Sequence, residues 1–138
     1  MDIENAKKIL SQGTHTCVLC RGEDTVCSNA RGVKPLLDLW DSGTDYSGYS
    51  AADKVVGRAT AFLYCLLGVK SLHAQVLSKP ALQVLENARI SITWDTLVEG
   101  IRNRENTGPC PMEYATRDVQ TPQQALEAIR QTLQALQS

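Results

Sequence analysis

The stretch "VKSLHAQVLSKPALQVLENARISITW", residues 69–94, decides the fold class. Its first part, residues 69–78, alternates in polarity and is rich in β-branched residues, which predicts a strand. Proline near the first turn predicts a helix from Lys79 to Glu86, and "ISITW", residues 90–94, predicts a second strand. Strand, helix and strand with short connections predict a right-handed parallel crossover.

Upstream of this unit, the sequence predicts two strands that pair as a hairpin, because residues 14–20 and 24–29 are β-rich and flank a short polar connector. Helices are predicted at residues 3–12 and 34–40, and a short strand at 46–50. Ser50 followed by Asp53 resembles a capping box, so we expect a long buried helix from Ser50 to Leu67, ending at Gly68.

Downstream of the unit, Thr96 with Glu99 predicts a short helix through Ile101, and a polar loop follows at residues 102–108. Two more helices are predicted, one from Pro111 and one opened by Thr121. The last helix is expected to bury one apolar stripe: Leu126, Ile129, Leu133 and Leu136. The elements together predict a single domain, residues 1–138, with the fold of a three-layer α/β/α sandwich.

The composition excludes several classes of protein. Fourteen basic and fifteen acidic residues leave a formal net charge of −1, so no overall charge attracts nucleic acid or an anionic membrane. The longest apolar stretch, residues 59–67, is too short to span a bilayer, and the polar N-terminal stretch does not resemble a signal peptide. Five cysteines without a tight framework favour reduced thiols, so we expect a soluble cytoplasmic protein.

The stretch "NTGPCPMEYATRD", residues 106–118, partly matches Pro-Cys-x-x-Cys, one of the two zinc-binding motifs of nucleobase deaminases. Here Cys110 is followed by Glu113, and His73 with Gln75 stands where such an enzyme has His-x-Glu. Glutamine cannot shuttle the proton that the reaction requires. His73 is also predicted on a strand, where a hydrogen-bonded histidine is the simpler interpretation, so we expect no metal site.

Cys17 and Cys20 are not expected to bind zinc either, because positions three apart on a strand face opposite sides. Glu113 falls at the third position of its helix, where its carboxylate is expected to cap that helix's own N–H groups. Cys110 at the same helix start could have a stabilised thiolate and be nucleophilic. The candidate catalytic residues are therefore Cys110, Glu113 and Lys54.

Four stretches closely resemble a family of small bacterial proteins of unknown function with a cytidine-deaminase-like fold: "SNARGVKPLL", "AADKVVGRATAFLY", "HAQVLSKPALQVLE" and "NRENTGPCPMEYATRD". The resemblance implies a mixed sheet of about five strands between helices. The deaminase fold carries its zinc motifs at two places. The resemblance implies that Ala52 and Lys54 stand here at the place of His-x-Glu, and that Pro80, Ala81 and Val84 stand at the place of Pro-Cys-x-x-Cys. The resemblance therefore implies that the metal ligands and the proton shuttle are missing, with no cofactor.

At the former active site the resemblance leaves Asp53 and Lys54, which we expect at the N-terminus of the buried helix. Either Lys54 points outward or pairs with Asp53, or it holds an anionic group of a ligand together with helix amides. Further donors could come from the neighbouring loops: Arg31, Arg102, Asn103 and Arg104.

Three functions stay open from the sequence. The first is binding of a small polar or nucleotide-like ligand at the former active site, where the nucleotide part rests on fold analogy. The second is an enzyme of different chemistry that uses Cys110 with Glu113 or Lys54. The third is a homodimeric interaction module without catalysis. Zinc-dependent deaminase activity is not expected.

Overall fold

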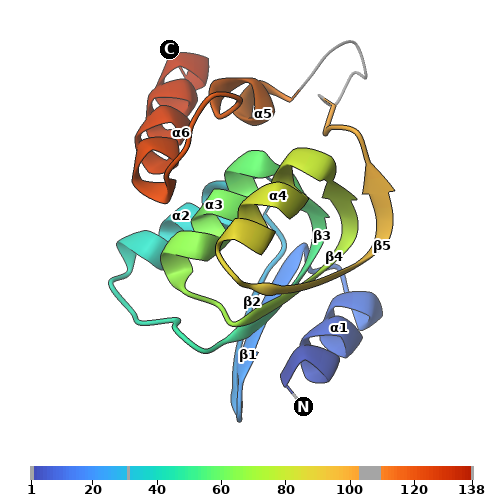
Figure 1. The fold of residues 1–138 in the computed structure, drawn as a ribbon. Coiled ribbons are helices and arrows are strands. Elements are labelled where there is room, and N and C mark those ends of the chain that lie inside the picture. Colours follow the sequence, from blue (N-terminus) through green and yellow to red (C-terminus); the bar gives the residue numbers. More distant parts are fainter. Residues whose placement is uncertain (1, 31, 103–109, 138) are drawn as a thin grey trace.

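A computed structural model describes residues 2–30, 32–102 and 110–137 of the chain. Within these residues the chain forms six helices and one five-stranded sheet (Figure 1). The elements are, in order, α1 (Asp2–Gln12), β1 (Cys17–Arg21), β2 (Asp24–Ser28), α2 (Lys34–Asp41), β3 (Ser50–Val56), α3 (Arg58–Leu67), β4 (Ser71–Ser78), α4 (Lys79–Asn87), β5 (Ser91–Val98), α5 (Pro111–Ala115) and α6 (Pro122–Gln137).

The sheet is mixed, with the strand order β2-β1-β3-β4-β5. β1 pairs antiparallel with both β2 and β3, whereas β3, β4 and β5 run parallel. The predicted hairpin and the predicted parallel β4-α4-β5 unit are confirmed. Because parallel strands end at the same edge of a sheet, the segments that follow β3, β4 and β5 start side by side.

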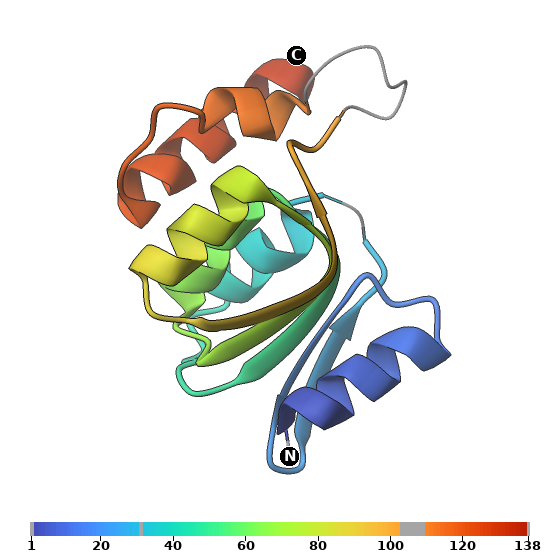
Figure 2. The ribbon, with the colours of Figure 1, turned by 45° about the vertical axis from the view of Figure 1, so that its right-hand side comes forward.

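Helices lie on both faces of the sheet (Figures 1 and 2). α1 packs on one face, where Ala6 and Leu10 meet Val18, Cys20 and Ala52. α2, α3 and α4 cover the other face over the larger core, and α6 packs against α3. Within the described residues, no helix is both long and apolar enough to cross a membrane.

β1 places its two cysteines in different cores, as the alternation of a strand requires. Cys17 belongs to the core beneath α3, and Cys20 belongs to the small core beneath α1. Both side chains are buried. Burial raises the pKa of the Cys17 thiol from 9.0 to about 12, so this thiol stays protonated at neutral pH.

The prediction of a long helix from Ser50 is wrong, because Ser50–Val56 forms the central strand of the sheet. Alanine favours helices, but Ala51 and Ala52 are both fully buried, on opposite faces of the sheet. Small side chains there let helices approach from both sides, and pairing with β1 and β4 satisfies the backbone. The helix begins at Arg58 and ends at Gly68, whose φ is 79°.

Three smaller predictions are also wrong. Residues 46–49 make a turn at Gly48, with φ 81°, instead of a strand. The helix expected at Thr96–Ile101 is absent from the described residues there, because β5 continues to Val98 in register with β4. Leu136 lies at the end of α6 and is 61% exposed, so the predicted apolar stripe ends before it.

The packing of β3 predicts that Ala52 cannot be enlarged. Replacement of Ala52 by Leu inserts three carbons between the sheet and α1, and we expect the free energy of unfolding to fall by about 1 to 3 kcal/mol. Urea denaturation measures this loss. Val55→Leu enlarges a side chain of the same strand that is 45% exposed and should leave stability nearly unchanged. Equal losses in both variants would contradict the assigned packing.

Candidate functional site

A cavity of about 540 Å³ opens where β3 ends and α3 begins. Its walls come from the chain before and at the start of β1, the segment between β2 and α2, the end of β3, the start of α3, and the start of α5. We call it the Asp53 pocket. The lining residues are Thr14, Thr16, Cys17, Asn29, Ala30, Gly32, Val33, Pro35, Leu36, Asp53, Lys54, Val55, Gly57, Ala59, Thr60, Ile101, Cys110, Met112 and Glu113.

The Asp53 pocket contains four residues that the sequence had singled out separately. Asp53, Lys54, Cys110 and Glu113 all line it, although the last two lie more than fifty positions further along the chain. Arg102 is exposed and follows Ile101 of the lining. The other three predicted donors lie outside the described residues: Arg31, Asn103 and Arg104.

Asp53 is a buried carboxyl group, with 8% of its surface exposed. Its Oδ2 accepts a hydrogen bond from the Tyr64 hydroxyl at 2.6 Å, and its Oδ1 accepts one from the Val55 N–H at 3.1 Å. Burial raises the pKa of Asp53 from 3.8 to about 7, although these hydrogen bonds oppose the rise. A carboxyl group that titrates near neutral pH beside a cavity is a candidate for binding or proton transfer.

The sequence predicted Lys54 at the N-terminus of a helix, and this prediction is wrong. Lys54 lies on the last part of β3, before α3 begins at Arg58. β3 continues past Lys54 to Val56. The backbone N–H of Lys54 donates a hydrogen bond to the Thr16 carbonyl at 3.0 Å. The side chain is half-buried. Its ammonium makes no ion pair or hydrogen bond within residues 2–30, 32–102 and 110–137, so the predicted pairing with Asp53 is not formed there.

Glu113 caps α3 instead of its own helix. Its Oε1 accepts a hydrogen bond from the backbone N–H of Arg58, the first residue of α3. The local prediction failed because α5 lies across the start of α3, where unpaired N–H groups favour a carboxylate. Burial raises the pKa of Glu113, and the Arg58 N–H and the Arg58 charge oppose that rise.

Arg58 completes a reciprocal contact with the α5 segment. Its guanidinium donates to the Thr116 carbonyl at 2.7 Å and to the Val119 carbonyl. The same group lies 5.0 Å from the Phe62 ring centre. The backbone of Arg58 therefore binds the start of α5, while its side chain binds the carbonyls that follow α5. These contacts hold the pocket wall that carries Met112 and Glu113.

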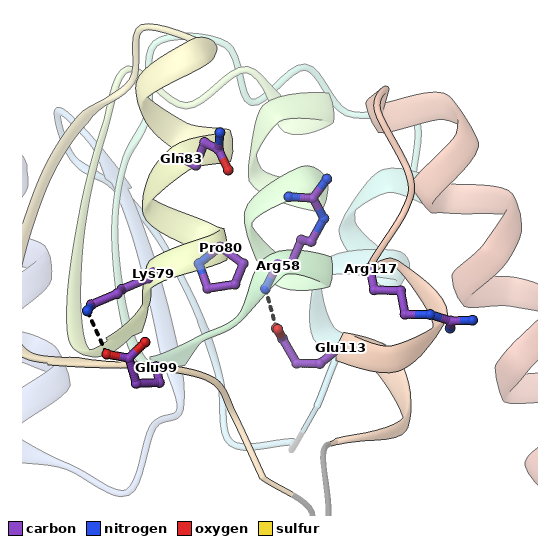
Figure 3. A pocket seen from close by; sticks show the side chains of 7 residues that line it. All are labelled: Arg58, Lys79, Pro80, Gln83, Glu99, Glu113 and Arg117. Carbon is purple, nitrogen blue, oxygen red and sulfur yellow. Dashed lines mark hydrogen bonds and ion pairs between the residues drawn. The ribbon is translucent and has the colours of Figure 1, made fainter.

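A second cavity, of about 450 Å³, is also lined by Glu113 (Figure 3). We call it the Arg58 pocket; it is lined by Arg58, Lys79, Pro80, Gln83, Glu99, Glu113 and Arg117. It sits just beyond the ends of β3, β4 and β5, where ligands often bind in parallel sheets.

The charges of the Arg58 pocket are already paired within the chain. Lys79 binds Glu99 at 2.6 Å, and Glu113 accepts the Arg58 N–H (Figure 3). Arg117 points away from Arg58 in the same view and lies 3.6 Å from the Tyr114 ring centre. A ligand there would have to displace these contacts, whereas the Lys54 ammonium has no partner in the described residues.

The residues considered for zinc lie apart. His73 is a buried, hydrogen-bonded strand residue, with Nδ1 2.7 Å from the Thr93 hydroxyl and Nε2 3.3 Å from Asp95. Cys110, which is partly buried, is at the N-cap of the five-residue α5. Among the residues that the structure describes, no three His, Cys, Asp or Glu side chains form a group that could hold a metal ion.

Sequence reasoning missed Arg58, Tyr64 and the Thr16 segment. Arg58 carried no usable signal, because the sequence placed it in the middle of a helix predicted from Ser50 to Leu67. Only the observed start of α3 at Arg58 sets its cation against the helix dipole. Tyr64 carried no signal either, since its contact with Asp53 depends on how α3 lies over the sheet. Thr16 was assigned to the hairpin, but its hydroxyl bonds to the Ala30 carbonyl at 2.6 Å and shapes the pocket rim.

Comparisons with known proteins agree with this fold. A family model, TM1506, described as a domain of unknown function (DUF1893), matches residues 5–133. The crystal structure of a DUF1893 family protein from Thermotoga maritima is similar with a TM-score of 0.86 and 22% sequence identity, covering 94% of this chain and 88% of that one. No curated protein matches. At this identity the crystal structure supports the fold alone.

The raised pKa of Asp53 predicts a pH-dependent gain of stability in Asp53→Asn. Folding favours the protonated carboxyl, so the wild-type protein loses stability as pH rises from about 4 to about 7, and this loss then levels off. The amide does not titrate. We expect the variant to gain stability relative to the wild type across this interval, on the order of 4 kcal/mol at most.

Urea denaturation at pH 4.5 and pH 8 measures the difference. Asp118→Asn is the matched control, because the Asp118 side chain is 90% exposed. A constant difference between Asp53→Asn and the wild type at the two pH values would contradict a raised pKa at Asp53.

The close approach of Glu113 to Gly57 predicts a second effect on stability. A Cβ at Gly57 would overlap the Glu113 carboxylate and lie 3.0 Å from the Ile101 side chain. Gly57→Ala should therefore lower the free energy of unfolding by about 1 to 3 kcal/mol. The loss should shrink in a Glu113→Ala background, where the overlap is gone. A double-mutant cycle by urea denaturation tests this coupling, and additive losses would contradict it.

Proposed function

We propose, for a chain that belongs to the DUF1893 family of unknown function, that the Asp53 pocket binds a small polar or nucleotide-like ligand. Lys54 would hold an anionic group of this ligand, and Asp53 would contact its polar part. The observation that carries the proposal is that Lys54, a half-buried residue whose side chain makes no hydrogen bond or ion pair within the described residues, lines the same cavity as the buried Asp53.

The size and lining of the pocket support this assignment. A volume of about 540 Å³ lies within the range of sites for small molecules. Apolar side chains form much of the wall, among them Val33, Leu36 and Met112. The Thr14, Asn29 and Thr60 side chains add polar groups that could orient a ligand.

A cytidine-deaminase-like fold is part of the proposal. The mixed sheet with its β2-β1-β3-β4-β5 order supports it. In that fold the zinc motifs open the helices after the third and fourth strands, and these helices begin here at Arg58 and Lys79. Gly57, Pro80 and Ala81 at these places have no side-chain group that binds a metal. This supports a ligand site without zinc-dependent deamination.

The contacts of Glu113 weigh against an enzyme that pairs Cys110 with this residue. Its Oε1 is engaged by the Arg58 N–H and ties α5 to α3, so it is poorly placed to take a proton from a thiol. Ligand binding at Lys54 requires no such rearrangement.

Binding measurements test the proposal. Ribose 5-phosphate and adenosine 5′-monophosphate are titrated into the protein and followed by amide NMR shifts. We expect the shifted amides to include those of β3 and the start of α3. Lys54→Ala should weaken binding about tenfold or more, because the anionic group loses its cation.

Lys70→Ala is the matched control, since Lys70 is an exposed lysine that precedes β4 at the opposite end of the sheet. It removes the same charge and should leave binding unchanged. Equal weakening in the two variants, or no binding of either phosphate ester, would overturn the proposal.

A further inference from the structure

We infer that Asp53 recognises an N–H donor edge of the ligand, which makes an amino-substituted nitrogen heterocycle the ligand class that the pocket selects. This inference rests on the proposed function, because it concerns the same pocket. In addition to the proposed function, Asp53 would accept hydrogen bonds from N–H groups on the uncharged part of the ligand.

The position of Asp53 is the first argument. The residue lies on the central strand, between Cys17 of β1 and Ala74 of β4. Its side chain is over nine-tenths buried and still lines the cavity. Asp53 is therefore part of the pocket wall while it is largely shielded from bulk solvent.

The remaining hydrogen-bonding capacity is the second argument. A carboxylate can accept about four hydrogen bonds. Two are supplied by the Tyr64 hydroxyl and by the Val55 N–H, and a backbone contact with Lys54 adds to them. These donors are neutral. Within the described residues no cation pairs with Asp53, so further donors from a ligand would stabilise its ionised form.

Among the other titratable groups around Asp53, Tyr64 already donates a hydrogen bond to it, and none in the described residues forms an ion pair with it. Cys17 faces it from β1 and Tyr64 from α3, and both have raised pKa values because of burial. The pocket also contains Lys54, Cys110 and Glu113. Lys54 follows Asp53 on the strand but makes no ion pair with it, so its cation is left for a second group of the ligand.

These features select a ligand that carries an anionic group together with N–H groups on a planar body. Amino groups on a heterocycle donate without bringing a full charge into the buried site, and a hydrogen bond from such a group to a carboxylate is stronger than one between neutral partners. Binding would lower the pKa of Asp53, so the ligand would release a proton from the protein near neutral pH.

The test uses pairs of probes that differ by one amino group. Guanosine 5′-monophosphate is compared with inosine 5′-monophosphate, adenosine 5′-monophosphate with purine riboside 5′-monophosphate, and ribose 5-phosphate serves as the probe without a base. Titration calorimetry at pH 7 in two buffers of different ionisation enthalpy measures affinity and proton release. Carbon-13 NMR of the carboxyl groups follows the titration of Asp53 with and without each probe.

We expect at least one aminated probe to bind about tenfold to a hundredfold more tightly than its partner without the amino group. The same probe should lower the pKa of Asp53 and release protons, and ribose 5-phosphate should do neither. Asp53→Asn, whose amide oxygen is an uncharged and weaker acceptor, should reduce the difference within the pair and abolish the proton release while Lys54 still holds the phosphate. Urea denaturation of Asp53→Asn confirms that it is folded, and the carboxyl titration needs only the wild-type protein.

Two failures can be told apart. If the phosphate esters bind through Lys54 but neither pair is distinguished and the titration of Asp53 is unchanged, the inference is overturned and the proposed function stands. If no probe binds, or if Lys54→Ala binds as the wild type does, the proposed function fails, and the inference fails with it.

Discussion

Strand β3 bonds to β1 along one side and to β4 along the other, and the rest of the structure depends on this placement. The antiparallel pairing with β1 sets Cys17 beside Asp53. The parallel pairing with β4 brings the starts of α3 and α4 to the same end of the sheet. Fully buried alanines at positions 51 and 52 allow helices to approach both faces. The end of β3 is consequently the place where a cavity forms between the sheet, α2, α3 and α5.

The reciprocal contact between Arg58 and the α5 segment shapes that end of the sheet. Glu113 supplies an acceptor to the first N–H of α3, and the Arg58 side chain binds carbonyls after α5. Glu113 thereby forms a shared wall of the two pockets. An anion-binding position at a helix start is filled by the protein's own carboxylate. Lys54, which lines the Asp53 pocket together with Glu113, makes no side-chain hydrogen bond or ion pair within the described residues.

Local patterns in the sequence predicted the elements whose neighbours agreed with them. The 69–94 unit, the hairpin and the terminal helices form as expected, with β5 longer than predicted. The alanines of residues 50–56 and the Ser50–Asp53 spacing suit a helix, which is why the local pattern predicted one. The structure has a strand there instead. Their strand conformation comes from pairing on both sides, which is a property of the sheet. The same limit applies to Glu113, whose nearest free N–H groups belong to a helix that begins far upstream.

The candidate site was also predicted only in part from the sequence. Cys110 and Glu113 could be named from the sequence because a thiol or carboxyl group at an expected helix start is chemically conspicuous, and Asp53 and Lys54 could be named through the family resemblance. The sequence by itself thus determined the α/β class, the order of most elements and the residues with chemical potential. Only the tertiary structure decided that these residues share one cavity, that Asp53 is buried against Tyr64 and that Glu113 is engaged. The physical reason is that burial and hydrogen-bond partners depend on segments distant in the chain, and local sequence carries no information about which of them meet.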